Sequence, residues 1–139
     1  FKTLASSLGC AARIDFAGYQ TGGALQAYVE RASLAISSWR WRENMPYSIV
    51  EAFAAGTPVI GTDIGGIPEL VDEWKTGFVC EPGGVQSMAD AISRGTSAFL
   101  DRSAYSMLQR NCRSYVMENC SREKFMNDLV NLYKESIDG

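Results

Sequence analysis

Two glutamates, Glu43 and Glu51, flank seven residues in the middle of the chain. The pattern around them predicts a strand over 34–37 and a helix over 46–55, so the pair lies where a strand gives way to a helix. A helix start presents free backbone N–H groups that suit a phosphate group, here those of Tyr47, Ser48 and Ile49. Because carboxylates accept hydrogen bonds from sugar hydroxyls, the spacing predicts a phosphate cradle with a carboxylate on either side. The alternative is two solvated glutamates, which a helix start also favours.

Alternating short strands and helices must position these residues. Apolar runs predict four strands, at 12–16, 34–37, 58–61 and 77–80. Helical spacing predicts helices between them and in the last third, at 2–8, 24–31, 46–55, 67–71, 85–100, 104–118 and 122–137. The predicted fold class is α/β, a Rossmann-like parallel sheet with helices on both faces and C-terminal helices packed at the edge. Four strands are fewer than a doubly wound sheet usually has, so we expect further strands before Phe1.

Composition excludes several classes of function. The net charge is −3 and the Lys and Arg residues are scattered, which argues against binding to nucleic acid. Histidine is absent and the four cysteines lack the close spacing of a zinc site, so we expect reduced thiols, no metal and no other cofactor. No apolar run reaches the roughly 20 residues of a membrane span. The segment Phe1–Leu4 lacks the charged-then-apolar layout of a secretory signal, so we expect none. We expect a cytoplasmic protein, with a peripheral place at the inner membrane face left open.

A second motif follows the two glutamates. The segment Ala52–Gly61 reads as a helix of small residues, a turn and a buried strand. After it, Gly65 and Gly66 are able to bring bare backbone close to a ligand, although a glycine pair more often forms a plain turn.

The run from Glu43 to Glu69 closely resembles the C-terminal domain of the retaining GT-B glycosyltransferases of family four. That family carries Glu-x7-Glu, then EAxAxGxPVI, then a Gly-Gly turn and a glutamate. The segments Arg13–Gly18 and Gly77–Gly83 resemble two of its strand ends, and Leu129–Tyr133 resembles its closing helix. The combined order and spacing of these motifs are highly specific, and they cover nearly the whole chain.

The resemblance implies two Rossmann-like domains that face a cleft. Residues 1–139 would be a partial C-terminal nucleotide-sugar-binding domain with a helical tail over about 101–139. The N-terminal acceptor domain and the family's basic residues for the diphosphate would lie upstream of Phe1. The implied activity is transfer of a sugar, such as a hexose, from a UDP- or GDP-sugar with retention of configuration, as in polysaccharide biosynthesis. We expect this chain alone to be inactive.

The resemblance also assigns site residues. Glu43 would be the catalytic residue that contacts the transferred sugar, and Glu51 would bind the nucleotide ribose. The remaining donor-binding residues would be Asn44, Met45, Pro46, Tyr47, Ser48, Ile49, Gly65 and Gly66. The chain departs from the family at Trp39–Arg42, where Arg40 or Arg42 would add charge for a phosphate. The simpler interpretation is solvated arginines between packed tryptophans.

Three other functions remain open. The chain could be a nucleotide-sugar-binding module without transfer activity, which activity of a longer protein would distinguish. It could belong to a GT-B sugar-nucleotide epimerase, whose need for acid–base groups fits poorly with the absence of histidine. A response-regulator-like domain would need an acidic cluster at the strand ends, and only Asp63 follows a strand suitably.

Overall fold

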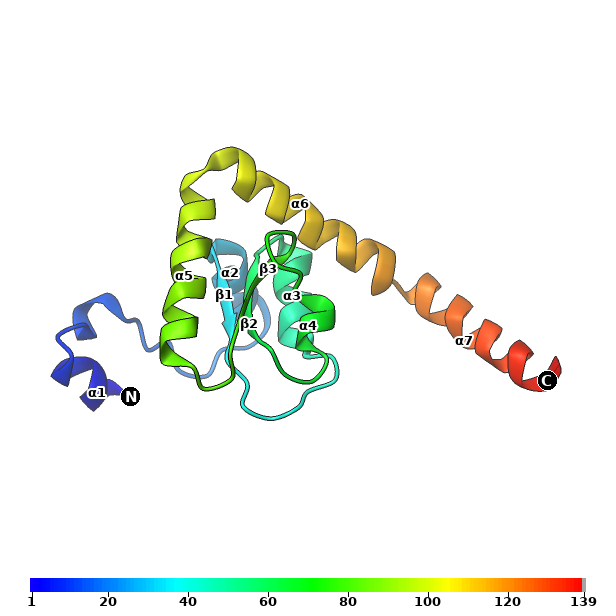
Figure 1. Cartoon of the computed structure of the whole chain (residues 1–139), viewed down its shortest axis with the longest axis horizontal. Coiled ribbons are helices and arrows are strands. Elements are labelled where there is room, and N and C mark those ends of the chain that lie inside the picture. Colours follow the sequence, from blue (N-terminus) through cyan, green and yellow to red (C-terminus); the bar gives the residue numbers. More distant parts are fainter. Residues whose placement is uncertain (139) are drawn as a thin grey trace.

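A small parallel sheet lies at the centre of the chain (Figure 1). In a computed structural model, which describes residues 1–138, the strands are β1 (Ala35–Ser37), β2 (Val59–Thr62) and β3 (Gly77–Cys80), in that spatial order. Both pairs are parallel, with Ile36 beside Ile60 and Ile60 beside Phe78. Every residue of β2 is buried, as expected for a short, apolar central strand of a parallel sheet.

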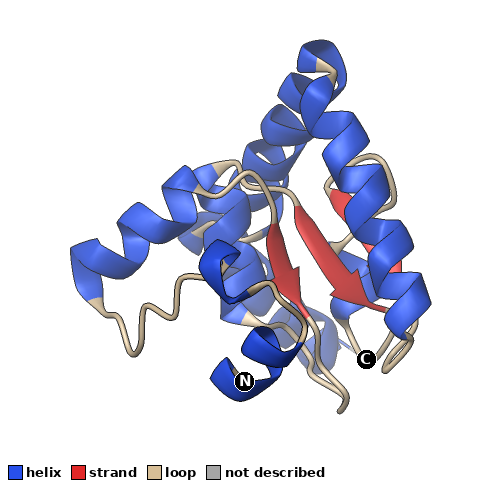
Figure 2. Cartoon of the chain, turned by 90° about the vertical axis from the view of Figure 1, so that its left-hand side faces the viewer, coloured by secondary structure: helices blue, strands red, loops and turns tan. Residues whose placement is uncertain are grey.

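Helices cover both faces of this sheet (Figure 2). The helical elements of the described chain are α1 (Lys2–Ser7), a 3-10 turn η1 (Ala11–Arg13), α2 (Gly22–Arg31), α3 (Tyr47–Ala55), α4 (Ile67–Leu70), α5 (Val85–Leu100), α6 (Arg102–Asn119) and α7 (Arg122–Asp138). One buried cluster joins β2 to α3, α4 and α6 through Val59, Phe53 and Cys112. The other joins the sheet to α5 and α6 through Phe78 and Leu108. The predicted Rossmann-like α/β fold is confirmed.

The strand predicted over 12–16 is wrong. Residues 11–13 form the 3-10 turn, Ile14 is extended, and residues 14–16 belong to no strand. A strand is stable only when its backbone groups have a neighbour, and this segment lies away from the sheet with Ile14 and Phe16 exposed. The apolar run therefore did not identify a strand, because the segment has no partner strand among the described residues.

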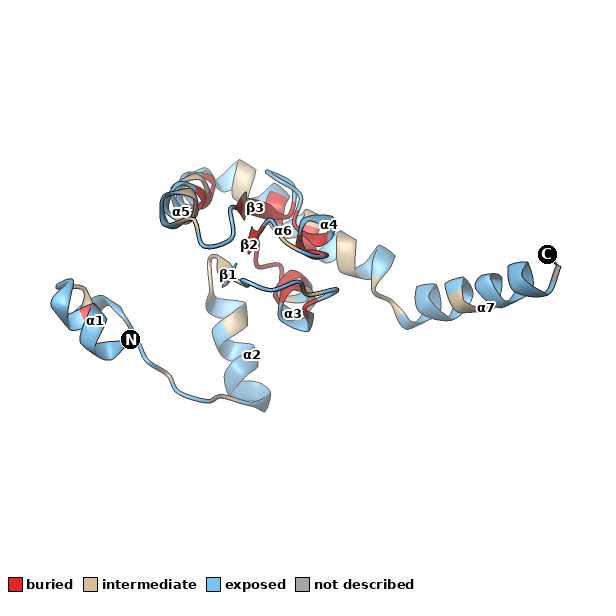
Figure 3. Ribbon diagram, turned by 60° about the horizontal axis from the view of Figure 1, so that its bottom comes forward, coloured by how far each residue is buried: buried red, intermediate tan, exposed pale blue. Residues whose placement is uncertain are grey.

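Of the last two helices, α6 packs against the body and α7 extends away from it. Helix α6 begins at Asp101, whose Oδ1 accepts the N–H groups of Ser103 and Ala104 at 2.9 and 3.2 Å. It crosses one end of the sheet and contacts both α3 and α5. Helix α7 begins after Ser121, whose hydroxyl accepts the Lys124 N–H at 3.1 Å. It then extends away from the body without a buried residue among 122–137 (Figure 3). Within residues 1–138, no helix combines the length and the hydropathy that crossing a membrane requires.

Candidate functional site

The three strands end at the same edge of the sheet, and the loop after β1 packs directly on the loop after β2. The Gly66 N–H donates a hydrogen bond to the Glu43 carbonyl oxygen at 2.7 Å. A Cβ atom on Gly66 would overlap the Asn44 carbonyl oxygen, and one on Gly65 would lie 2.5 Å from the Glu43 carbonyl oxygen. Gly65 also has a φ of +62°, which favours glycine. The glycine pair therefore makes room for the backbone that carries Glu43, a role in the packing of two loops.

The Glu43 side chain is held by the unusual Trp-Arg-Trp segment. The Trp41 Nε1 donates a hydrogen bond to Glu43 Oε1 at 3.1 Å. The Trp41 ring meets the Trp39 ring edge-on, with centroids 4.8 Å apart. The Thr62 hydroxyl, buried at the end of β2, donates to the Trp39 carbonyl oxygen at 2.9 Å. The orientation of Glu43 is thus connected to the central strand.

Helix α3 starts at the same edge. Pro46 is its N-cap, with a φ of −62° and an extended ψ of 115°, and no side chain caps the helix. The Ile49 N–H donates to the Pro46 carbonyl oxygen at 3.0 Å, so the expectation that it is free is wrong. Within residues 1–138, the N–H groups of Tyr47 and Ser48 have no acceptor. These two donors, with the positive end of the helix dipole, are available for an anion.

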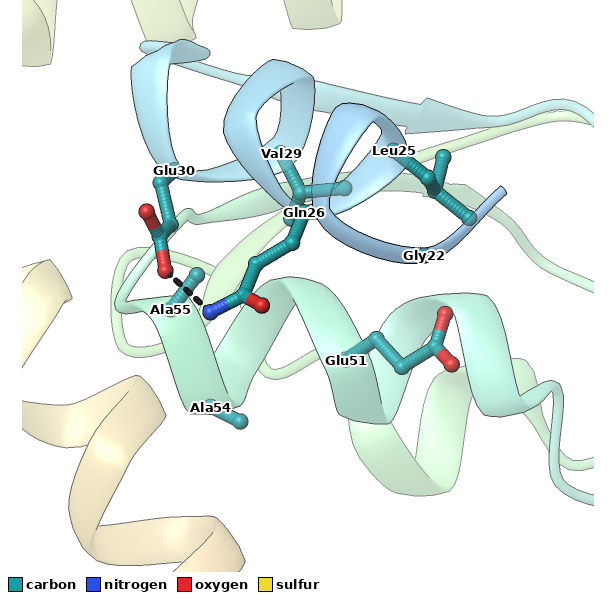
Figure 4. A pocket seen from close by; sticks show the side chains of 8 residues that line it. All are labelled: Gly22, Leu25, Gln26, Val29, Glu30, Glu51, Ala54 and Ala55. Atoms are coloured by element: carbon teal, nitrogen blue, oxygen red, sulfur yellow. Dashed lines mark hydrogen bonds between the residues drawn. The ribbon is translucent and has the colours of Figure 1, made fainter. Parts of the chain in front are cut away.

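A hollow of about 490 Å³ lies between α2 and α3. Figure 4 shows Glu51 on α3 with its carboxylate beside the first turn of α2. The other lining residues are Gly22, Leu25, Gln26, Val29, Glu30, Ala54 and Ala55. The Gln26 amide donates to Glu30 at 2.6 Å, and the Thr57 hydroxyl fixes the end of α2 by donating to the Val29 carbonyl oxygen at 3.0 Å. Glu51 therefore faces a defined concavity with polar and apolar walls.

The two predicted glutamates lie in different parts of the site. Glu43, Asn44, Gly65 and Gly66 come together through their backbones at the carboxyl edge. Glu51 lines the hollow with α2, and Glu43 is not part of that lining. The α2 side of the hollow was not predicted, because the helical spacing of 24–31 does not reveal which helix it packs against. The Trp41 contact was also missed, although the unusual composition of that segment was visible in the sequence.

The cysteines take no part in this site. Burial raises the pKa of Cys112 to about 12, and its Sγ–H donates to the Thr76 carbonyl oxygen at 3.3 Å in the core. Burial also raises the pKa of Cys80, an effect that Arg94 partly offsets. All four cysteines are free thiols, and no group of three or more His, Cys, Asp or Glu side chains in the described residues is placed to hold a metal ion.

Comparison with known proteins identifies the family of the chain. Residues 1–113 match the family described as Glycosyl transferases group 1. The chain belongs to this family. Among curated group 1 relatives, N-acetyl-alpha-D-glucosaminyl L-malate synthase of Bacillus anthracis is 28% identical over 125 residues, which are 90% of this chain and 31% of that protein. D-inositol 3-phosphate glycosyltransferase of Salinispora tropica is 30% identical over 140 residues, 96% of this chain and 27% of that protein.

Solved structures share the fold of this glycosyl transferase chain. Sucrose-phosphate synthase from Thermosynechococcus elongatus superposes with a TM-score of 0.82 at 25% identity, covering 99% of this chain and 33% of that one. Anabaena HepE, solved in complex with UDP-glucose, gives 0.79 at 20% identity, covering 96% and 35%. The chain thus spans about a third or less of the length of the first curated relatives it matches.

Proposed function

We propose that this group 1 glycosyl transferase chain binds a UDP- or GDP-sugar at the carboxyl edge of its sheet and supplies the donor site for sugar transfer. One observation carries the proposal. The two free N–H groups at the start of α3 lie in the sequence between Glu43, whose backbone contacts the loop after β2, and Glu51, which lines the α2–α3 hollow. In open α/β sheets, ligands bind beyond the carboxyl ends of the strands.

Three of the parts of a nucleotide-sugar, the diphosphate, the ribose and the transferred sugar, suit three parts of this edge. The diphosphate would accept hydrogen bonds from the N–H groups of Tyr47 and Ser48 and from backbone nearby. The ribose would enter the hollow, where its hydroxyl groups would donate hydrogen bonds to the Glu51 carboxylate beside the exposed Leu25. The sugar would lie on the other side of the helix start, against Glu43 and the loop formed by Asn44, Met45 and Pro46. HepE, whose fold this chain shares, is a protein solved with UDP-glucose, which supports this donor class.

The proposed reaction transfers the sugar with retention of configuration. The bond between the anomeric carbon and the donor phosphate oxygen breaks, and its electron pair leaves with the nucleoside diphosphate. An acceptor hydroxyl forms the new bond to the anomeric carbon and gives its proton to the departing phosphate. The helix dipole and the free N–H groups stabilise the developing negative charge, while Glu43 orients the ring that develops positive charge. No metal ion or other cofactor is needed in this scheme.

The acceptor site belongs to the remainder of a longer protein in this proposal. Residues 1–139 would be part of a C-terminal domain, with a preceding domain that binds the acceptor and supplies the basic residues for the diphosphate. The isolated chain would then bind donor without transferring sugar. We place the whole protein in the cytoplasm, at the inner membrane face if its acceptor is there, in a role such as polysaccharide synthesis.

Calorimetry with UDP-glucose and with GDP-mannose tests the donor site. The whole protein should bind one of them, and Glu51→Ala should weaken binding by about 1–3 kcal/mol, the range for losing hydrogen bonds to a charged group. Glu118→Ala is the matched control, since Glu118 is exposed on α6 and outside the α2–α3 hollow. Equal binding by the Glu51→Ala protein and the unchanged protein would remove the ribose role. Failure of both nucleotide-sugars to bind would contradict the donor-site proposal.

A further inference from the structure

We infer that Trp41 is a positioning residue that holds the Glu43 carboxylate in the orientation needed to meet the donor sugar. This inference rests on the proposed function of Glu43 and adds a residue that acts through it. The observation behind it is the hydrogen bond from Trp41 Nε1 to Glu43 Oε1, 3.1 Å long, in a loop that the strand ends position.

The contact is the last in a series that starts in the core. Thr62 lies at the end of the central strand and is 2% exposed, and its hydroxyl donates a hydrogen bond to the Trp39 carbonyl oxygen at 2.9 Å. The half-buried Trp39 ring packs against the cluster beneath α3 and α4, and meets Trp41 edge-on at 4.8 Å. Edge-to-face pairing is a preferred arrangement of aromatic rings. The indole N–H of Trp41 therefore has a fixed direction, although the residue is 58% exposed.

The chemistry of the indole suits this role. A tryptophan N–H is a donor only, whereas a carboxylate has two acceptor oxygens. Trp41 occupies Oε1 of Glu43, and within residues 1–138 no side chain or backbone group donates to Oε2. The second oxygen remains available for a sugar hydroxyl. A glutamate side chain without a partner samples several rotamers, and ordering it during the reaction costs free energy, so holding it in advance favours turnover.

Exposure argues against a purely structural role for Trp41. The buried clusters of the chain contain Trp39 at their edge but not Trp41. Neighbouring Arg40 points toward the turn after β3, with its guanidinium 3.8 Å from where a Cβ of Gly83 would lie. The segment is thus already anchored by Trp39, and the Trp41 ring adds the donor to Glu43.

The first test measures this hydrogen bond without any substrate. In a ¹H–¹⁵N spectrum of the whole protein, Glu43→Ala should move the indole N–H resonance of Trp41, assigned through its loss in Trp41→Phe. The indole resonance of Trp74 should stay in place, because Trp74 lies just before β3, where its ring meets the Phe78 ring edge-on and does not contact Glu43. An unmoved Trp41 resonance would overturn the inference.

The second test measures turnover as nucleoside diphosphate released from UDP-glucose or GDP-mannose, with water as the acceptor. Trp41→Phe keeps the ring against Trp39 and removes the donor. We expect kcat to fall about three- to tenfold with KM unchanged, the effect of one partly exposed hydrogen bond to a charged group. Trp74→Phe, the same substitution at a similarly exposed position, should leave kcat and KM unchanged. Thermal melting of both variants identifies any loss of folding.

The outcomes separate this inference from the proposed function. If Glu43→Ala lowers kcat and Trp41→Phe does not, the inference is wrong and the proposed role of Glu43 remains. If Glu43→Ala leaves kcat unchanged, the proposed function of Glu43 fails and the inference fails with it. In the Glu43→Ala background, adding Trp41→Phe should cause no further loss, since residues that act through one another are not additive. Additive losses would show that Trp41 acts independently of Glu43, and would overturn the inference.

Discussion

Gly66 is the residue on which the approach of the two site loops depends most directly. Any Cβ there would overlap the Asn44 carbonyl oxygen, which is backbone and cannot rotate away. We expect Gly66→Ala to lower the free energy of unfolding by about 1–3 kcal/mol, the range for overpacking. The measurement is chemical denaturation of the chain. Gly23→Ala is the control, because a Cβ there meets nothing within 4 Å, and it should leave stability unchanged or slightly raised. A neutral Gly66→Ala would contradict the close packing of the loops.

Substitutions of the two glutamates should affect different kinetic constants. The ribose does not change during transfer, whereas the sugar ring develops charge, so an interaction with the ring matters most in the transition state. In the whole protein, Glu43→Ala should lower kcat by at least about tenfold, equivalent to about 1.4 kcal/mol, with a smaller change in KM. Glu51→Ala should mainly raise KM. Steady-state kinetics would contradict these roles if both substitutions left kcat and KM unaltered, or if their effects were exchanged.

Residue type and spacing singled out Glu43, Glu51 and the glycine pair as candidates, and their chemical roles stay predictions. The structure brings the backbone of Glu43 against the glycine pair, as expected for short loops that follow neighbouring parallel strands. The separation of Glu51 into a hollow with α2 was not predictable, since it depends on how two helices pack. Similarly, the Ile49 N–H is used by Pro46 because the chain turns tightly at the helix start, which residue type alone does not specify.

At the scale of elements, the buried Cys112 thiol of α6 donates a hydrogen bond to the Thr76 carbonyl oxygen, directly before β3. Burial holds the pKa of Cys112 at about 12 in the folded chain, above the ordinary value of 9.0. The folded state therefore retains the proton to higher pH than the unfolded state. The resulting stabilisation is complete below pH 9 and is lost as pH rises toward 12.

Denaturation curves across this pH range test the Cys112 assignment. The free energy of unfolding should fall between pH 9 and pH 12, and Cys112→Val should have a shallower slope, because valine has no proton to lose. An identical slope in Cys112→Val would show that the thiol is not held protonated by the fold.

Strands and helices differed in how well the sequence predicted them. Helix α5 has the predicted bounds of 85–100, because a long amphipathic pattern between a glycine and an acidic cap leaves little freedom. The strand at 12–16 failed because pairing is a property of two segments, and alternation in one segment carries no information about the other. The other three short strands lie within one residue of their predicted bounds, and the runs at 58–61 and 77–80 have proline or glycine at their boundaries.

At the scale of the whole molecule, α7 adds little to the folded body. Its side chains over 122–137 are exposed or partly exposed, and the helix extends beyond α6. We expect a chain that ends at Ser121 to retain the free energy of unfolding of the complete chain to within about 0.5 kcal/mol, the range for surface changes. Denaturation followed by the three tryptophans, all outside α7, measures this directly. A large loss of stability would show that α7 packs against the α/β body in solution.

The central claim is that a nucleoside diphosphate binds at the carboxyl edge of the sheet. An NMR titration of the ¹⁵N-labelled chain with UDP tests it most directly, since it locates binding even when Kd is about 1 mM, equivalent to about −4 kcal/mol. We predict shifts in the amide resonances of Tyr47, Ser48, Glu51 and Gly66, with small shifts elsewhere. If the protein uses a GDP-sugar, GDP and not UDP should cause these shifts. The absence of shifts with either nucleotide, or shifts confined to the polar hollow between Asp72 and α6, would contradict the claim.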